Sequence, residues 1–120
     1  MLYFMLKSKI HQAHITKNDL NYEGSITIDR ELMKIAKIVP YEMVHVYNIS
    51  NGERFSTYTM PGEPGEICLN GAAARKGQVG DSIIIAAYTL MEEELIEGYK
   101  PIIISVDKGN AIERVSFGED

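Results

Sequence analysis

Apolar and polar residues alternate in several short runs along this chain, which is the pattern of half-buried β-strands. Residues 2–6 are apolar without a break and predict a buried strand, which residues 7–16 continue with partial alternation. Further strands are predicted over 25–28, 42–49, 54–60, 66–70, 82–88 and 101–106. About seven short strands separated by turn signals predict a mainly β fold, either a small barrel or a sandwich.

The segments between these runs predict short helices and turns. Asp29 is a suitable N-cap for a short helix through about Lys37. Asn51-Gly52 predicts a hairpin, and residues 71–76 predict one helical turn that ends at Gly77. Residues 16–19 are expected to form a turn or a short helical start, and residues 61–65 a turn. Residues 91–95 suggest one helical turn. The tail after Lys108, polar apart from Ile112, Val115 and Phe117, is expected to fray.

Composition narrows the function classes. A chain of 120 residues with 45% hydrophobic residues has room for a single domain, 1–120, with its own core. A net charge of -5 argues against nucleic-acid binding, which needs clustered Lys and Arg. Cys68 is the only cysteine and is expected to be a small core residue. The N-terminus lacks the features of a signal peptide, and no apolar run is long enough to span a membrane, so a cytoplasmic protein is expected.

Gly24-Ser25 is the stretch with the most distinctive chemistry. Most such pairs are plain turns. Glycine, however, tolerates backbone conformations that are closed to other residues, so the fold can strain this peptide. The Ser25 hydroxyl could then attack the Gly24 carbonyl, and elimination and hydrolysis would leave a pyruvoyl group.

Polar residues within the predicted strands supply further candidates. Arg54 and Tyr58 would share one strand face and Thr57 the other, either as a solvated edge or as a carboxylate fork with a nearby proton donor. Lys9 and His11 would form a polar outer face or an anion-binding pair. The small residues after Asn70 would form a plain turn or allow the close approach of another group.

Together these motifs resemble one family. Lys9-x-His11, Tyr22-Glu23-Gly24-Ser25, the segment 51–58 and Asn70-Gly71-Ala72-Ala73-Ala74 are similar in order and spacing to bacterial aspartate 1-decarboxylases. These pyruvoyl-dependent lyases make β-alanine for pantothenate synthesis. Ile26 stands where many members carry Cys or Val, and Tyr47 where some carry Trp, but both keep strand-compatible character.

The resemblance implies a double-psi β-barrel with short helices, assembled as a homotetramer with active sites between subunits. It also implies autocatalytic cleavage between Gly24 and Ser25 into a β chain, 1–24, and an α chain, 25–120. The pyruvoyl group derived from Ser25 would form a Schiff base with L-aspartate, without a metal or pyridoxal phosphate. Whether cleavage is spontaneous or needs a maturation factor stays open.

The resemblance also implies roles for single residues. Thr57 would position the Gly24 carbonyl, Asn70 would stabilise charge on oxygen, and Tyr58 would donate a proton. Substrate-binding residues would be Arg54, Thr57, Lys9, His11, Asn70, Gly71, Ala72 and Ala73. Two alternatives remain: a β-barrel interaction module that never cleaves, and a pyruvoyl decarboxylase for another amino acid.

Overall fold

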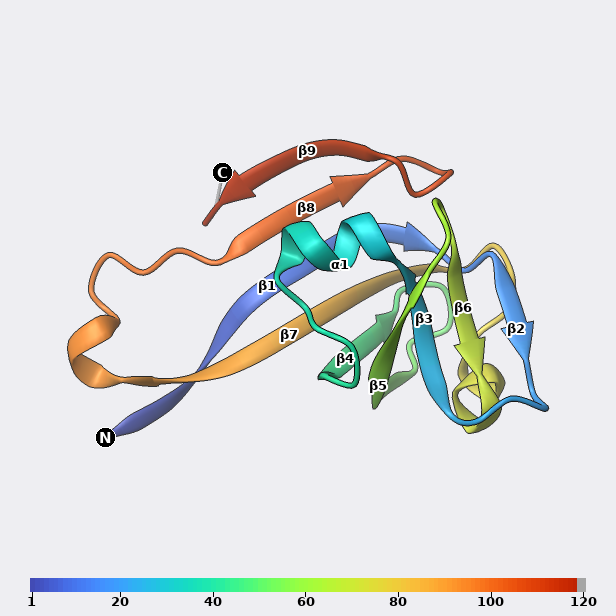
Figure 1. The fold of residues 1–120 in the computed structure, drawn as a ribbon, viewed down its shortest axis with the longest axis horizontal. Helices are drawn as coiled ribbons and strands as arrows, with labels where there is room; N and C mark the ends of the chain where they lie inside the picture. The colour runs from blue at the N-terminus through green and yellow to red at the C-terminus, as the bar shows by residue number, and fades with distance from the viewer. Residues whose placement is uncertain (119–120) are drawn as a thin grey trace.

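The computed structural model describes residues 1–118 and is built mainly from strands (Figure 1). Within that range lie one α-helix, α1 (Arg30–Ala36), and two 3-10 helices, η1 (Gly71–Lys76) and η2 (Glu93–Leu95). The predicted mainly β fold with short helices is confirmed, whereas the double-psi arrangement stays a prediction. The strands are β1 (Leu2–His14), β2 (Lys17–Asp19), β3 (Ser25–Asp29), β4 (Met43–Asn48), β5 (Arg54–Gly62), β6 (Ile67–Asn70), β7 (Ser82–Glu92), β8 (Ile102–Val106) and β9 (Ile112–Phe117).

The strands follow the order β2-β6-β3-β5-β4-β7-β1-β8-β9 and mix parallel with antiparallel pairs. The longest pair is β1 with β7, whose antiparallel register runs from Leu2 opposite Glu92 to His14 opposite Ser82. Figure 1 shows these two strands projecting away from the end of the molecule where β3, β5 and β6 lie. That second end holds the Gly24-Ser25 peptide, at the start of β3.

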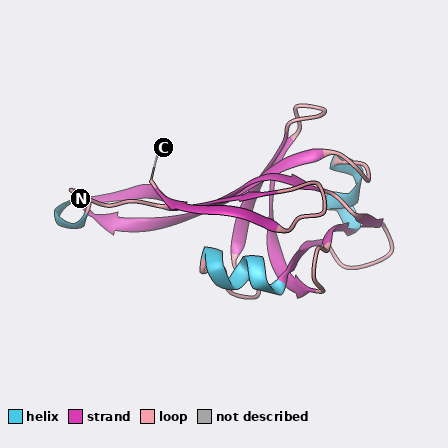
Figure 2. Ribbon diagram, turned by 90° about the horizontal axis from the view of Figure 1, so that it is seen from above, coloured by secondary structure: helices cyan, strands magenta, loops and turns pink. Residues whose placement is uncertain are grey.

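The core forms where the inner faces of the strands meet α1. Alternate strand residues such as Ile10, Val46 and Ile85 are fully buried, as the period-2 pattern predicts. Helix α1 packs against β1, β3, β5 and β8. In Figure 2 it lies in the lower part of the picture, on one side of the long strands. The predicted N-cap is confirmed, because the Asp29 carboxylate accepts a hydrogen bond from the Glu31 backbone N–H at 2.8 Å.

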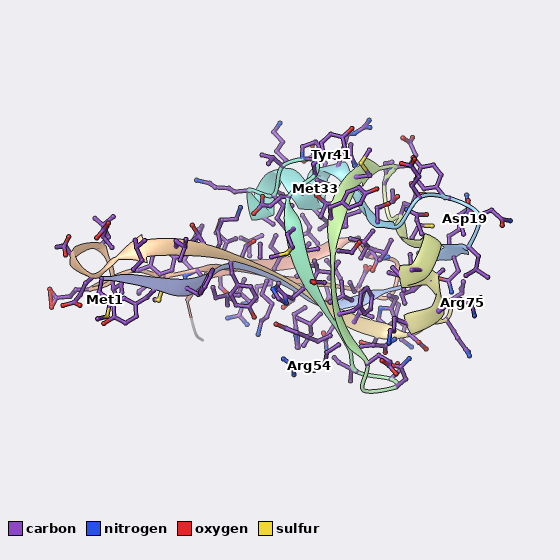
Figure 3. The ribbon with its side chains drawn as sticks, turned by 90° about the horizontal axis from the view of Figure 1, so that it is seen from below. Met1, Asp19, Met33, Tyr41, Arg54 and Arg75 are labelled. Carbon is purple, nitrogen blue, oxygen red and sulfur yellow. The ribbon has the colours of Figure 1, made fainter. Side chains whose placement is uncertain are left out.

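The prediction that residues 2–6 form a buried strand is wrong in its burial. Leu2, Tyr3 and Phe4 belong to β1 but are 54%, 39% and 79% exposed. They pair with β7 at the projecting end of the ribbon, where Met1 lies at the tip, remote from α1 (Figure 3). Apolar character therefore predicted the strand correctly but not the exposure of its first residues.

Three further predictions are corrected by long-range pairing. Residues 17–19 form β2, a strand parallel to β6, rather than a turn or a helical start. The tail after Lys108 does not fray over the described residues, because 112–117 form β9 against β8. Pro61 and Gly62 extend β5 beside β3 instead of opening a turn.

Candidate active site

Ser25 is the first residue of β3 and is fully buried. The antiparallel register places it opposite Asn70, the last residue of β6. Asn70 Nδ2 donates a hydrogen bond to Ser25 Oγ at 2.9 Å. The Ser25 hydroxyl in turn faces the Glu23 carbonyl oxygen at 3.5 Å, a long contact. The serine oxygen next to the Gly24 carbonyl therefore carries a hydrogen-bond donor, which can stabilise negative charge there.

The Asn70 side chain is the centre of a small polar network. Its Nδ2 also donates to Thr27 Oγ1 at 2.9 Å, and its Oδ1 accepts from the Cys68 thiol at 3.2 Å. Asn70 and Cys68 are both 3% exposed. Sequence reasoning predicted Asn70 but missed the part of Thr27 and Cys68. The only signal was their alternation with Ser25 and Asn70 on two strands whose pairing was not known.

The backbone of Gly71 lies in close contact with the segment that precedes Ser25. Its φ is +59°, in the left-handed region that favours glycine. A Cβ at this position would lie 2.7 Å from both Gly24 N and the Tyr22 carbonyl oxygen. The start of η1 thus holds the segment 22–24 at a distance that a side chain would prevent.

A surface cavity of about 210 Å³ adjoins this peptide at Gly24. Gly24 and Thr57 lie in its wall together with Ala72 and Ala73. The structure therefore brings these four predicted residues together. Phe55, Ser56 and Lys76 complete the lining, and sequence reasoning had not selected them.

Arg54 and Tyr58 lie on the outer face of β5. The regular register with β4 puts Arg54, Ser56 and Tyr58 on one face, as predicted, and Thr57 on the other. The Arg54 guanidinium lies over the Tyr47 ring, 4.1 Å from its centroid, and Figure 3 shows Arg54 at the surface of the molecule. The Tyr58 ring stacks on Tyr41 at a centroid separation of 6.2 Å.

A hydrogen bond to Tyr88 holds the Tyr47 ring that lies beneath Arg54. Tyr47 and Tyr88 are joined through their hydroxyl oxygens at 2.8 Å. Desolvation, followed by the hydrogen bond to Tyr47, raises the pKa of Tyr88 to about 12. His45 contacts the edge of Tyr88 at a centroid distance of 5.1 Å. Tyr88 therefore stays neutral in ordinary buffers and keeps the Tyr47 ring in place.

Lys9 and His11 do not join Ser25 within one chain. Across neighbouring strands, Lys9 pairs with Ala86, Ala86 with His45, and His45 with Ser56, so these side chains lie on one face of the sheet. Arg54 precedes Ser56 by two residues on β5 and therefore lies on the same outer face. Lys9 itself lies three strand spacings from β5, however, or roughly 14 Å. Lys9 lines a separate cavity of about 410 Å³ that also contains Arg114.

A comparison with known proteins decides the family. The family model described as aspartate decarboxylase matches residues 1–113. This chain belongs to the aspartate decarboxylase family. The resemblance seen in the sequence is therefore confirmed.

Several curated members of the aspartate decarboxylase family are similar to the chain over most of its length. A protein named aspartate 1-decarboxylase from Caldicellulosiruptor bescii is 58% identical over 118 residues, covering 97% of this chain and 92% of the relative. One from Thermoanaerobacter pseudethanolicus is 57% identical over 109 residues, covering 89% and 93%. One from Desulfotalea psychrophila is 48% identical over 117 residues, covering 96% and 98%. The name that these relatives share describes a lyase.

The described residues, 1–118, offer neither a cluster of metal-ligating side chains nor a membrane-spanning helix. That range contains no group of three or more His, Cys, Asp and Glu side chains placed to hold a metal ion. None of its helices has the length and apolar character needed to cross a membrane.

Proposed function

We propose that this chain is a proenzyme that cleaves itself between Gly24 and Ser25 and then decarboxylates L-aspartate to β-alanine and carbon dioxide. The product would feed the synthesis of pantothenate and coenzyme A. The observation that carries the proposal is the hydrogen bond of 2.9 Å from Asn70 Nδ2 to buried Ser25 Oγ. It supports cleavage because it gives the serine beside a glycine carbonyl a donor on its oxygen. Membership of the family supports aspartate as the substrate.

The cleavage begins as Ser25 Oγ bonds to the Gly24 carbonyl carbon. The peptide C–N bond breaks, and the hydroxyl proton passes to the released nitrogen. Loss of the Ser25 Cα proton then breaks the Cβ–Oγ bond, which leaves a carboxylate on Gly24 and a dehydroalanine at position 25. Hydrolysis releases ammonia and leaves a pyruvoyl group at the start of the α chain, 25–120, with 1–24 as the β chain. Negative charge develops on Oγ as its proton leaves and again as the Cβ–Oγ bond breaks, and the Asn70 amide donates to that atom.

The surroundings of Ser25 fit a pyruvoyl group. The site is buried and small, and the Asn70 amide offers a donor to an oxygen there. When present, this group supplies an electron-withdrawing ketone that binds the substrate amine and assists the loss of carbon dioxide. Thr57, in the wall of the adjoining cavity, positions the Gly24 carbonyl before cleavage.

The outer face of β5 supplies substrate recognition in this proposal. The Arg54 guanidinium binds the side-chain carboxylate of aspartate with a two-pronged hydrogen bond. The other carboxylate, which departs, then lies away from Arg54, so geometry selects which one is lost. Tyr58, on the same strand face, donates a proton to the carbon that loses its carboxylate.

The placement of Lys9 and His11 supports active sites that lie between the subunits of a homotetramer. Both residues share the outer face of the sheet with Arg54 but lie strands away from it within one chain. In an assembly, Lys9 and His11 of one subunit line the pocket that contains Ser25 of the next. The enzyme acts in the cytoplasm, and a maturation factor, where cleavage is assisted, acts on the Gly24–Ser25 peptide.

The test of this proposal compares two serine variants. Ser25→Ala removes the attacking hydroxyl, so this protein stays full-length and forms no β-alanine from aspartate. Ser82→Ala, at the start of β7, is the control and keeps both cleavage and activity. β-Alanine production by Ser25→Ala at the wild-type rate would refute the proposal. Glutamate and neutral amino acids, assayed beside aspartate, test the choice of substrate.

A further inference from the structure

The orientation of the Asn70 amide decides whether a hydrogen-bond donor or an acceptor faces Ser25 Oγ. With Nδ2 toward Ser25, the amide donates to Oγ at 2.9 Å. Turned over, the same side chain would offer Oδ1, an acceptor with no capacity to stabilise negative charge on the serine oxygen. Asn70 is 3% exposed, so its orientation depends on the few groups around it.

Two of those groups are hydroxyls and do not select an orientation. Ser25 Oγ and Thr27 Oγ1 both contact Asn70 Nδ2 at 2.9 Å. A hydroxyl can accept from an amide nitrogen or donate to an amide oxygen by rotating its proton. Each would therefore pair with either end of the amide.

Cys68 is the neighbour that favours one orientation of the Asn70 amide over the other. Its thiol donates to Asn70 Oδ1 at 3.2 Å, while its other acceptor, the Leu69 carbonyl oxygen, is more distant at 3.8 Å. A thiol is a weak donor and a weaker acceptor, so it favours the oxygen end. Desolvation by burial, with a smaller effect of Glu66, raises the pKa of Cys68, so the proton stays on sulfur at neutral pH.

We propose that Cys68 is a positioning residue for self-cleavage, because its thiol holds Asn70 Oδ1 and so directs the amide N–H groups toward Ser25 Oγ. The inference rests on the proposed function, in which Ser25 is the attacking residue. Charge forms on Oγ when its proton leaves and again when the Gly24 carboxylate departs. A donor fixed there assists both steps, and Cys68 keeps that donor in place without touching the reacting atoms.

The experiment uses paired substitutions that differ mainly in the donor. Cys68→Ser keeps a donating group, and Cys68→Ala removes it. Each proenzyme is purified soon after synthesis, and denaturing mass spectrometry follows the cleaved fraction over time. We expect Cys68→Ser to cleave within about threefold of the wild-type rate and Cys68→Ala to cleave about tenfold more slowly or worse. The effect of Cys68→Ala should be smaller than that of removing the donor that contacts the reacting oxygen itself.

A second pair separates the lost hydrogen bond from lost packing. Cys68→Thr and Cys68→Val have nearly the same shape, and β-branched residues suit a strand. The hydroxyl variant should cleave faster than the Val variant, while thermal unfolding shows that both are folded. This pair also serves if Cys68→Ala fails to fold.

The outcomes are distinguishable. Cleavage of Cys68→Ala at the wild-type rate, or of folded Cys68→Thr as slowly as Cys68→Val, overturns the role of Cys68 and leaves the proposed function standing. A wild-type chain that is active without any cleavage overturns the proposed function and this inference with it.

Discussion

Gly71 lies against Gly24 so closely that a Cβ on Gly71 would stand 2.7 Å from the Gly24 nitrogen. The same Cβ would meet the Tyr22 carbonyl oxygen at 2.7 Å. Real side chains do not tolerate such distances, so the backbone of one segment would have to move. Close packing of two backbones therefore fixes the peptide on which the proposed cleavage depends.

Gly71→Ala should block or strongly slow cleavage, because the methyl group would displace the segment 22–24 from Asn70. The φ of +59° adds strain of about 1–2 kcal/mol for a non-glycine residue. Denaturing mass spectrometry measures the cleaved fraction, and thermal melting measures the stability lost.

Gly98→Ala is the matched control for this strain. Gly98 has a φ of +80°, and a Cβ there meets nothing within 4 Å. We expect this variant to lose stability by a similar backbone effect and still to cleave. Equal cleavage of the two variants would show that the contact with Gly24 has no bearing on processing.

Asn70→Asp tests the donor on Ser25. An ionised carboxylate accepts hydrogen bonds and cannot donate to Oγ, so we expect cleavage to slow by about 10²-fold or more. A time course of the purified proenzyme gives the rate. Asn110→Asp is the control, because Asn110 is also buried and donates to backbone carbonyls, of His14 and Gly65, outside the site. If Asn70→Asp keeps the wild-type rate, the donor is not needed.

Arg54→Lys should raise the KM for aspartate by about tenfold or more while kcat changes less, since an ammonium group cannot form the two-pronged bond. It would also lose the planar contact with the Tyr47 ring, now at 4.1 Å. Cleavage should proceed normally, because Arg54 does not contact the Ser25 network. Arg30→Lys at the exposed start of α1 is the control. Unchanged kinetics would remove Arg54 from substrate binding.

Tyr88→Phe tests the alkaline behaviour of the tyrosine pair. The pKa of Tyr88 is raised to about 12, whereas a tyrosine in the unfolded chain ionises near pH 10. The folded state therefore binds this proton more tightly. The resulting stability is complete below about pH 10 and is lost as the pH rises toward 12. In urea titrations, wild type should lose more free energy of unfolding between about pH 9 and about pH 11 than Tyr88→Phe.

The control for this titration is Tyr41→Phe, at a residue that is 71% exposed. It should follow the wild-type curve. An identical loss in wild type and Tyr88→Phe would mean that folding does not make Tyr88 hold its proton more tightly.

Local patterns predicted those parts of the fold that local physics decides. The Asp29 cap, the turn at Asn51-Gly52 and the face shared by Arg54 and Tyr58 all follow from residues close in sequence. The strands β2 and β9 were missed because short segments, polar in β2 and mixed in β9, become strands only when a partner, β6 or β8, offers its edge. The exposure of Phe4 likewise depends on what lies over the ribbon, which its own sequence does not encode.

The same limit applies to the candidate site. The motif around Gly24-Ser25 was visible in the sequence, but its support by Cys68 depends on the register between β3 and β6. Lys9 and Arg54 were predicted to serve one pocket, and the register places them strands apart on one face. Residue type predicted the chemistry, and only strand order revealed which groups meet.

The mass of the wild-type protein under denaturing conditions tests the central claim most directly. Active protein should give two fragments, one of residues 1–24 and one of residues 25–120 that begins with a pyruvoyl group in place of Ser25. A preparation that converts aspartate to β-alanine while showing only the intact chain of 120 residues would contradict the account.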